Sequence, residues 1–309
     1  MGADSVTGHF KDLLGKYLVS PMHDPTIFYE DNAEQTPYMI YGSKDYQYHI
    51  VRLGEDMISV DEKPRPIIIN GAEWEQEPGW LDKNYFFKQG DTYYLSWGSG
   101  YATSKNIYGP YECQGYFGEG HHLGNLAHSS FFWWKGQFYH IWCYYIRKGY
   151  RYRSTIISYC HVGDDGKIST DTKFLDAHFS HGVARYDSSW DMVEAEWYYE
   201  ISDNSHKRGA ISEGFYALLN GKNSFVRFSN FNFEKVTKTM TINLSSSRDT
   251  EIEVREGGLD GQLLGSLKVK GNDKRECVNF DVDIDKGSHD LYIINKGDST
   301  LNIDWFKFN

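Results

Sequence analysis

The feature that most constrains this 309-residue chain is a period-two alternation of apolar and polar residues in short runs. Successive side chains of a β-strand point to opposite faces, so this period is typical of strands with one buried face. Tight polar turns separate the runs, such as KQGD at 88–91, WKGQ at 134–137 and DDGK at 164–167. Sustained helical periodicity is absent from the sequence. The chain is therefore predicted to be all-β.

The strands expected between residues 24 and 175 fall into three groups. They are 26–29, 38–41 and 49–53, then 85–88, 93–97 and 112–116, then 130–134, 138–145 and 155–161. Each group is typical of a four-stranded meander of roughly 50 residues, which is the spacing of propeller blades. The first part of the chain is therefore predicted to be a β-propeller.

The alternation is lost around residues 181–192, and strands with a different spacing follow. They are expected at 225–228, 239–244, 251–256, 277–282, 289–295 and 302–308, the spacing of a β-sandwich. A chain of this length is expected to form two domains, each with its own core. We place them at residues 1–190, propeller-like, and 191–309, a β-sandwich.

Composition narrows the class of partner. The formal net charge of −11 comes without a concentrated basic run, which argues against nucleic acid or an anionic membrane as the main partner. The 24 Tyr and 9 Trp suit the faces of sugar rings, although β-rich proteins are often rich in aromatic residues. No signal peptide or membrane-spanning run is recognisable. The four cysteines lack zinc spacing and are expected to be buried thiols: Cys113, Cys143, Cys160 and Cys277.

The two ends of the C-terminal segment carry a family resemblance. The segment opens with VEAEWY (193–198) and closes with HDLYIINKG (289–297) and NIDWFKF (302–308). In these motifs it resembles carbohydrate-binding module family 6. The resemblance implies a jelly-roll β-sandwich with a glycan-binding cleft and a structural calcium site.

Three carboxylates in these motifs are candidate metal ligands. Glu194 and Glu196 lie two residues apart and share a face if they are on a strand, and Asp304 is expected on a neighbouring strand. Converging carboxylates repel each other unless a hard cation binds them. The resemblance identifies that cation as Ca²⁺. The alternative is that the three carboxylates are only solvated.

The sugar cleft of this family uses an aromatic platform. Aligning the turn at Asn220 puts Ala217 at the position of the family's stacking tyrosine, with Tyr216 next to it. The loop at 271–277, which supplies a tryptophan in the family, reads GNDKREC, while Asn302 matches the family's polar ligand. The module is therefore expected to bind glycan through Tyr216 and Asn302, to bind it elsewhere, or to brace the first domain.

Three segments of the N-terminal part carry a second resemblance. They are FKDLLGKYLVSPMHDPTIFYED (10–31), EPGWLDKNYFFKQGDTYYLSW (77–97) with ATSKNIYGPYECQGYF (102–117), and NLAHSSFFWWKGQFYHIW (125–142). They resemble glycoside hydrolase family 43, the five-bladed arabinofuranosidase, xylosidase and arabinanase propellers. The resemblance implies a secreted protein that acts on arabinoxylan, xylan or arabinan with inversion. Inversion needs a general acid and a general base, and a third carboxylate that keeps the acid's pKa high.

The resemblance assigns two of these roles. Asp24, in HDPTIF, matches the carboxylate that modulates the pKa of the acid. Glu77, in EPGW, matches the general acid if the alignment is anchored on Trp80, which is expected to contact substrate. Anchoring on the proline selects Gln76 instead, and Glu75 is a further contender.

Two more residues match substrate-proximal positions of the family. His128 matches a histidine that projects toward the propeller centre, although a lone histidine is more often structural. Arg153, in RYRSTIISY, matches an arginine on a strand near the substrate.

The general base has no match. In the family it lies in a blade upstream of the modulating carboxylate, whereas here 23 residues precede Asp24 and residues 3–16 resemble the end of a blade. Asp4 and Asp12 fall in turn or outer positions. Three interpretations follow: a shortened glycosidase with reduced or lost activity, a non-catalytic glycan-binding protein, or an enzyme completed by a partner chain or an unusual base. The strand edges of an open propeller also predict self-association.

Overall fold

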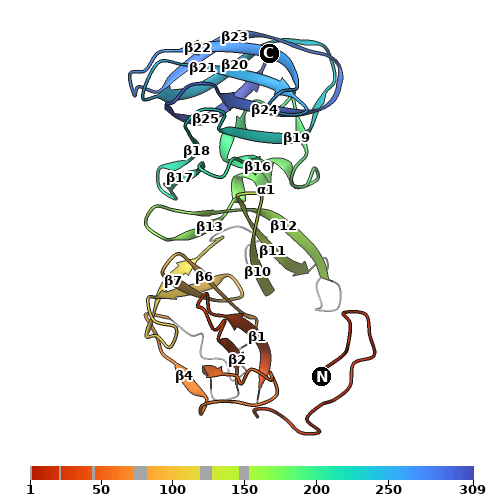
Figure 1. The fold of residues 1–309 in the computed structure, drawn as a ribbon, viewed down its shortest axis with the longest axis vertical. Coiled ribbons are helices and arrows are strands. Elements are labelled where there is room, and N and C mark those ends of the chain that lie inside the picture. Colours follow the sequence, from red (N-terminus) through yellow and green to blue (C-terminus); the bar gives the residue numbers. More distant parts are fainter. Residues whose placement is uncertain (1, 21, 44–45, 73–81, 119–126, 146–152) are drawn as a thin grey trace. The chain divides into compact units, whose positions relative to one another are not determined.

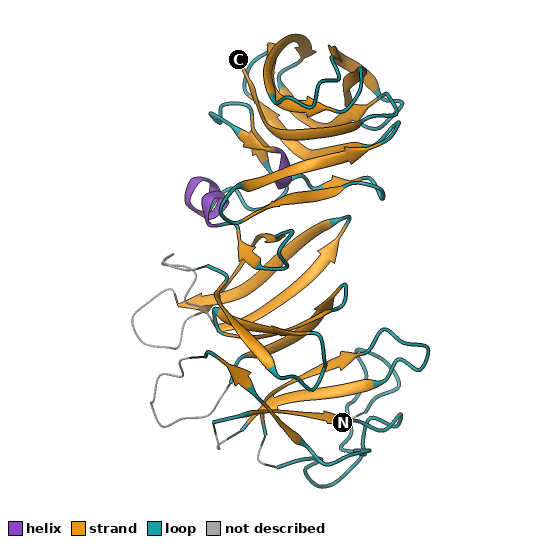
Figure 2. Ribbon diagram, turned by 90° about the vertical axis from the view of Figure 1, so that its left-hand side faces the viewer, coloured by secondary structure: helices purple, strands orange, loops and turns teal. Residues whose placement is uncertain are grey.

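A computed structural model describes residues 2–20, 22–43, 46–72, 82–118, 127–145 and 153–309 (Figure 1). Strands dominate these ranges, whose helical segments are α1 (Thr172–His178) and the 3₁₀ helix η1 (Ala195–Trp197) (Figure 2). The predicted all-β class is confirmed. Among the described residues no helix has both the length and the apolar character needed to cross a bilayer.

Two sheets contain the strands expected from the first two groups. The first has the order β1 (His23–Tyr29), β2 (Pro37–Gly42), β3 (Tyr48–Arg52), β4 (Arg65–Ile67). The second has the order β5 (Ile69–Asn70), β9 (Tyr111–Tyr116), β8 (Gly100–Ser104), β7 (Thr92–Trp97), β6 (Asn84–Gln89). Their buried side chains form one cluster that includes Ile40, Tyr48, Phe86, Leu95 and Tyr111.

The third sheet has the order β10 (Ala127–Trp134), β11 (Gln137–Tyr145), β12 (Arg153–Val162), β13 (Ile168–Thr170). Its first hairpin turns at Lys135 and Gly136, which have φ of 53° and 74°. Positive φ at both central residues gives the turn a twist that matches the strands it joins. A Cβ on Gly136 would lie 2.4 Å from Cγ2 of Ile201, so glycine is required here for space as well. These sheets have the size of blades, and their closure into a propeller stays a prediction.

The C-terminal strands form a β-sandwich of two sheets, as predicted. One sheet has the order β14-β19-β24-β21-β22 with β16 paired to β19, and the other β23-β20-β25-β18-β17 with β15 paired to β25. The pair Gly265 and Val282 joins the two sheets through β22 and β23. The strands are β14 (Tyr186–Asp187), β15 (Val193–Glu194), β16 (Glu200–Ile201), β17 (His206–Ala210), β18 (Gly214–Asn220), β19 (Phe225–Phe233), β20 (Thr237–Ser246), β21 (Thr250–Glu256), β22 (Gln262–Val269), β23 (Glu276–Ile284), β24 (Gly287–Asn295) and β25 (Thr300–Phe308).

The chain divides into two compact units. Unit 1 consists of residues 1–130 and 142–156, and unit 2 of residues 131–141 and 157–309. Parts of β11 and β12 therefore pack with the sandwich in unit 2, where Tyr139, Tyr159 and Phe174 belong to the same buried cluster as Phe228 and Phe306. The domain boundary at residues 190 and 191 stays a prediction.

A polar network also joins β11 and β12 to the sandwich within unit 2. Gln137 is fully buried, and its Nε2 donates to the carbonyl oxygens of Glu196 at 2.9 Å and Tyr198 at 2.6 Å. The ammonium of Lys207 donates to Gln137 Oε1 at 2.5 Å and to the Cys160 carbonyl at 2.8 Å. Burial lowers the pKa of Lys207 to about 8, although the nearby groups, including the charge of Glu196, oppose this shift.

Asp171 organises the other side of this network. Its Oδ1 accepts from the Phe174 backbone N–H at 2.7 Å and caps α1, while its Oδ2 lies 2.9 Å from His161 Nε2 and accepts from Trp197 Nε1 at 2.5 Å. His161 Nδ1 lies 3.0 Å from the Lys207 ammonium, so the neutral imidazole accepts there and donates to Asp171. Burial, and then the charge of Lys207, lowers the pKa of His161 to about 4.

Candidate functional site

Asp24 lies at the beginning of β1 in a conformation unusual for a residue with a side chain. Its φ is 45°, and the pairing of β1 with β2 shifts register between His23 and Thr26. Pro25 lacks an N–H and cannot continue the ladder, which explains the irregularity. Oδ2 of Asp24 accepts a hydrogen bond from the backbone N–H of Lys83 at 2.9 Å, and the side chain remains 30% exposed. The carboxylate is thus held by β1 and by the residues just before β6, with one oxygen left for another partner.

Asp24 has two titratable neighbours that the sequence analysis missed. Ligand atoms of His23, Asp24 and Asp82 all lie within 4.8 Å of one another. His23 Nε2 is 3.9 Å from Asp24 Oδ1, and Lys83 Nζ is 2.5 Å from Asp82 Oδ1. Two carboxylates, an imidazole and an ammonium therefore gather where β1 and β6 begin. The packing of the two strands brings the groups together, and no local motif announces it.

The backbone of this cluster is tied to the core of unit 1. The hydroxyl of Tyr48 donates to the Asp82 carbonyl at 2.7 Å. Burial raises the pKa of Tyr48, and the negative charges of Asp82 and Asp24 raise it further. Tyr48 is therefore a permanent donor at neutral pH, which fixes the position of Asp82.

Of the other four residues predicted near the active site, the structure describes only two. Glu77 and Trp80 lie in residues 73–81, outside the described residues. His128 is exposed on β10 with φ of 62°, and no hydrogen bond or ion pair joins it to Asp24 in the described part of the chain. Arg153 is exposed at the first position of β12. The structure thus brings Asp24 together with Asp82, while the roles of the other four residues stay predictions.

The three predicted calcium ligands lie on elements that meet in the sandwich. β15 pairs with β25, so that Glu194 is opposite Trp305, next to Asp304. The expectation that Glu194 and Glu196 share one strand face is wrong, because the chain leaves the sheet after Glu194 and Glu196 lies in η1. Glu194 forms an ion pair with Lys173, and Asp304 is 3.1 Å from Arg275 Nη1. The three carboxylates therefore have different partners and do not form a single cluster of ligand atoms.

Glu196 differs from the other two carboxylates. Like Glu194 it is 7% exposed, but its Oε2 is buried without a hydrogen-bond partner among the described residues. Burial raises its pKa well above the usual value, and the charges of Asp171 and Asp304 add to this effect. An unpaired buried carboxyl oxygen is costly, so this position suits either a proton or a cation.

Tyr216 and Asn302 share the outer face of the sheet formed by β18 and β25. Leu218 pairs with Asn302, and Tyr216 lies two residues from Leu218 on the same strand. Asn302 Nδ2 donates to Ser245 Oγ at 3.2 Å, whereas its Oδ1 is buried without a partner among the described residues. Arg275 lies over the Tyr216 ring, 5.4 Å from its centroid. Ala217 points into the core and is fully buried, so Tyr216 is the available ring.

The cysteine prediction needs correction. Cys160 is buried, but Cys113 and Cys143 are half-buried and Cys277 is exposed. Cys277 lies on the outward face of β23, where its Sγ accepts from Asn243 Nδ2 at 3.0 Å. The exposed side of the sandwich sheet, not sequence spacing, explains this difference.

The C-terminal β-sandwich is similar to a known family of modules. Residues 194–309 match the family described as carbohydrate binding module (family 6). Over 99% of its length the chain is 24% identical to an arabinoxylan arabinofuranohydrolase from Paenibacillus polymyxa. The chain spans about half, 55%, of the length of this relative. The resemblance to glycoside hydrolase family 43 followed by a family 6 module is thereby confirmed.

Two solved structures are similar to the chain, one over nearly its whole length and one over part of it. One is a glycoside hydrolase family 43 arabinoxylan arabinofuranohydrolase from Bacillus subtilis in complex with cellotetraose, with 22% identity, 99% of this chain and 73% of that chain covered, and a TM-score of 0.45. The other is a β-1,3-glucan binding family 6 module from Bacillus halodurans, with 23% identity, 40% of this chain and 98% of that chain covered, and a TM-score of 0.37.

Proposed function

We propose that this chain acts on plant cell-wall polysaccharide of the arabinoxylan, xylan or arabinan type as an inverting glycoside hydrolase. Glu77 is the general acid, and Asp24 keeps its pKa high. The observation that carries the proposal is the hydrogen bond from the Lys83 backbone to Asp24. It attaches the proposed modulator to the residues that directly follow the segment containing Glu77.

The charges around Asp24 suit this role. A general acid must keep its proton near neutral pH, and negative charge nearby makes its ionisation costly. Asp24 and Asp82 supply two carboxylates, of which Asp82 is paired with Lys83. Asp24 therefore provides the charge that is felt by a neighbouring acid. Inversion further requires a base that activates water on the opposite face of the sugar. No residue of this chain is assigned that role, so turnover is expected to be reduced or lost unless a partner chain or an unusual base supplies it.

Turnover of arabinoxylan, xylan, arabinan and aryl glycosides tests this proposal in a way that also separates the two contenders for the acid. Glu77→Gln is expected to lower kcat at least 10²-fold, the typical contribution of a general acid. Glu75→Gln is the matched control and is expected to retain activity. A loss confined to Glu75→Gln would transfer the role to Glu75, and a wild-type chain without turnover on all four substrates would refute the hydrolase.

A second candidate function is glycan binding without hydrolysis through Tyr216 and Asn302. It is favoured by the placement of Tyr216 and Asn302 on the same outer face of the sheet formed by β18 and β25. Retention on insoluble xylan measures this binding. Tyr216→Ala and Asn302→Ala are expected to weaken retention, whereas Tyr17→Ala, at a tyrosine that is 82% exposed elsewhere, is expected to leave it unchanged.

We further propose that Glu196 binds a structural Ca²⁺ together with Glu194 and Asp304, which requires Glu194 to leave Lys173 and Asp304 to leave Arg275. Its unpaired buried oxygen fits a hard cation, which prefers carboxylate oxygens. The cation would hold Glu196 ionised and link η1 to β25. Self-association through strand edges also stays a prediction, and sedimentation velocity at high protein concentration checks it.

A further inference from the structure

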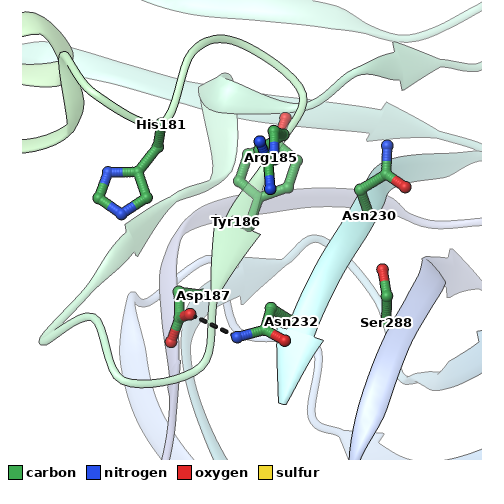
Figure 3. A pocket seen from close by; sticks show the side chains of 7 residues that line it. All are labelled: His181, Arg185, Tyr186, Asp187, Asn230, Asn232 and Ser288. Atoms are coloured by element: carbon green, nitrogen blue, oxygen red, sulfur yellow. Dashed lines mark hydrogen bonds between the residues drawn. The ribbon is translucent and has the colours of Figure 1, made fainter. Parts of the chain in front are cut away.

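A polar pocket in unit 2 lies where residues 181–187 meet β19 and β24 (Figure 3). Its volume is about 480 Å³, a size typical of small-ligand sites. The lining residues are His181, Arg185, Tyr186, Asp187, Asn230, Asn232 and Ser288. Four of them precede residue 194, where the match to the module family begins, so the pocket is a feature of this chain and not of the module alone.

The wall of the pocket is held in place by the sheet. β14 pairs in parallel with β19, Tyr186 opposite Phe231 and Asp187 opposite Asn232. The Ser188 N–H donates to the Asn232 carbonyl at 2.9 Å. The Tyr186 ring is 2% exposed and stacks on Phe231 with centroids 5.6 Å apart. Because this ring offers no free face, recognition in the pocket rests on polar groups.

Both carboxylate oxygens of Asp187 already accept hydrogen bonds from neighbouring residues. Its Oδ2 accepts from Asn232 Nδ2 at 2.7 Å, and its Oδ1 accepts from the N–H and Oγ of Ser189 at 2.9 and 2.6 Å. Burial opposes ionisation, but hydrogen bonds from Ser189 and Asn232 outweigh it and lower the pKa of Asp187. Asp187 therefore orients Asn232 and leaves the other side chains to meet a ligand.

The rest of the pocket lining consists mainly of side chains that can donate hydrogen bonds. Within the described residues, the exposed side chains of Arg185, Asn230 and Ser288 make no hydrogen bond or ion pair. His181 Nδ1 lies 3.4 Å from Ser180 Oγ, and its ring contacts His178 and Trp190. In Figure 3 Arg185 comes from the segment that leads into β14, Asn230 from β19 and Ser288 from β24. An arginine fork matches a carboxylate in two parallel hydrogen bonds, and amide and hydroxyl groups pair with sugar hydroxyls.

We propose that this pocket binds a single uronic acid residue, a sugar ring that carries a carboxylate. The carboxylate pairs with Arg185, and ring hydroxyls pair with Asn230 and Ser288. The lining contains none of the residues proposed for catalysis, and its occupation does not depend on hydrolysis.

Calorimetric titration of the full chain with glucuronic acid, glucuronamide and glucose tests this assignment. Glucuronic acid is expected to bind at least tenfold more tightly than the two neutral probes, and added salt to weaken it. Arg185→Gln is expected to lower the affinity for glucuronic acid at least tenfold. Arg248→Gln, at an exposed arginine of the same unit, is the matched control and is expected to bind like the wild type.

Ser288→Leu provides a second variant, because it narrows the pocket while leaving Arg185 intact, and it is also expected to lose binding. Equal affinity for glucuronic acid and glucose would overturn the proposal that the ligand carries a carboxylate. Wild-type affinity in both Arg185→Gln and Ser288→Leu would overturn the site. Glu77→Gln is expected to bind glucuronic acid normally, so failure of the proposed hydrolase is distinguishable from failure of the pocket.

Discussion

Replacing Lys207 by Met is expected to change the stability of unit 2 by an amount that depends on pH. The pKa of Lys207 is lowered from 10.5 to about 8, and each unit corresponds to about 1.4 kcal/mol, so the environment disfavours the ammonium by about 3 kcal/mol at pH 7. Methionine removes this cost, but it also removes the donor to Gln137, Cys160 and His161. A buried acceptor left unpaired costs about 1–3 kcal/mol. With three acceptors the loss is about 3–9 kcal/mol, so the variant is expected to be no more stable than the wild type at pH 7.

The sign of the pH dependence follows from proton binding. Between the folded pKa of about 8 and the unfolded value of 10.5 the unfolded state binds more protons, so wild-type stability rises with pH. Lys207→Met lacks this gain and is expected to be more destabilised at pH 10 than at pH 7 by about 2–3 kcal/mol. Urea unfolding followed by circular dichroism at both pH values measures the difference. Lys268→Met, at an exposed lysine, is the matched control. A difference between Lys207→Met and wild type that does not change with pH would refute the reasoning.

Three further outcomes follow from the same contacts. The pKa of His161 is about 4 in the folded protein against an ordinary value of 6.5, so stability is lost as the pH falls from 6.5 to 4, by up to about 3 kcal/mol, and urea unfolding of His161→Gln should lack this loss. Millimolar Ca²⁺ should raise the melting temperature of the wild type but not of Glu196→Gln; an equal rise in both would remove Glu196 from the calcium site. Gly136→Ala should lower the free energy of unfolding by about 2 kcal/mol or more, because φ is 74° and the new Cβ meets Ile201 at 2.4 Å, whereas Gly90→Ala, with φ of 55° and open space, should cost about 1 kcal/mol.

Most strands could be predicted because period-two alternation is a local property. The turn at residues 134–137 is a clear example, since Lys135 and Gly136 have the positive φ that a two-residue hairpin requires. Helix α1 was missed because its seven residues are too few to show a helical period, and its only N-terminal signal is the cap of Asp171. β17, at His206–Ala210, was missed as well, because it carries mostly polar residues.

The candidate site was predictable only where a motif carries it. Asp24 was found through its Asp-Pro motif, whereas Asp82 was not, because the two carboxylates meet only after β1 packs against β6. The hydrogen bond between Asn84 and Thr26 in this packing joins residues that are 58 positions apart in the chain. The predicted position of Glu196 on a strand was wrong because the chain forms η1 there, and no residue pattern in VEAEWY indicates this change. Sequence reasoning thus reaches the elements and motifs, while side chains that converge through tertiary packing require the structure.

The pH dependence of kcat/KM on arabinoxylan, for the wild type and Asp24→Asn, tests most directly whether Asp24 holds the proton of Glu77. Removing the negative charge of Asp24 lowers the pKa of a neighbouring acid. The alkaline limb of the profile is therefore expected to move to lower pH by about one unit, together with a loss of rate. An alkaline limb at the same pH in both proteins, or a wild type without turnover, would contradict this role.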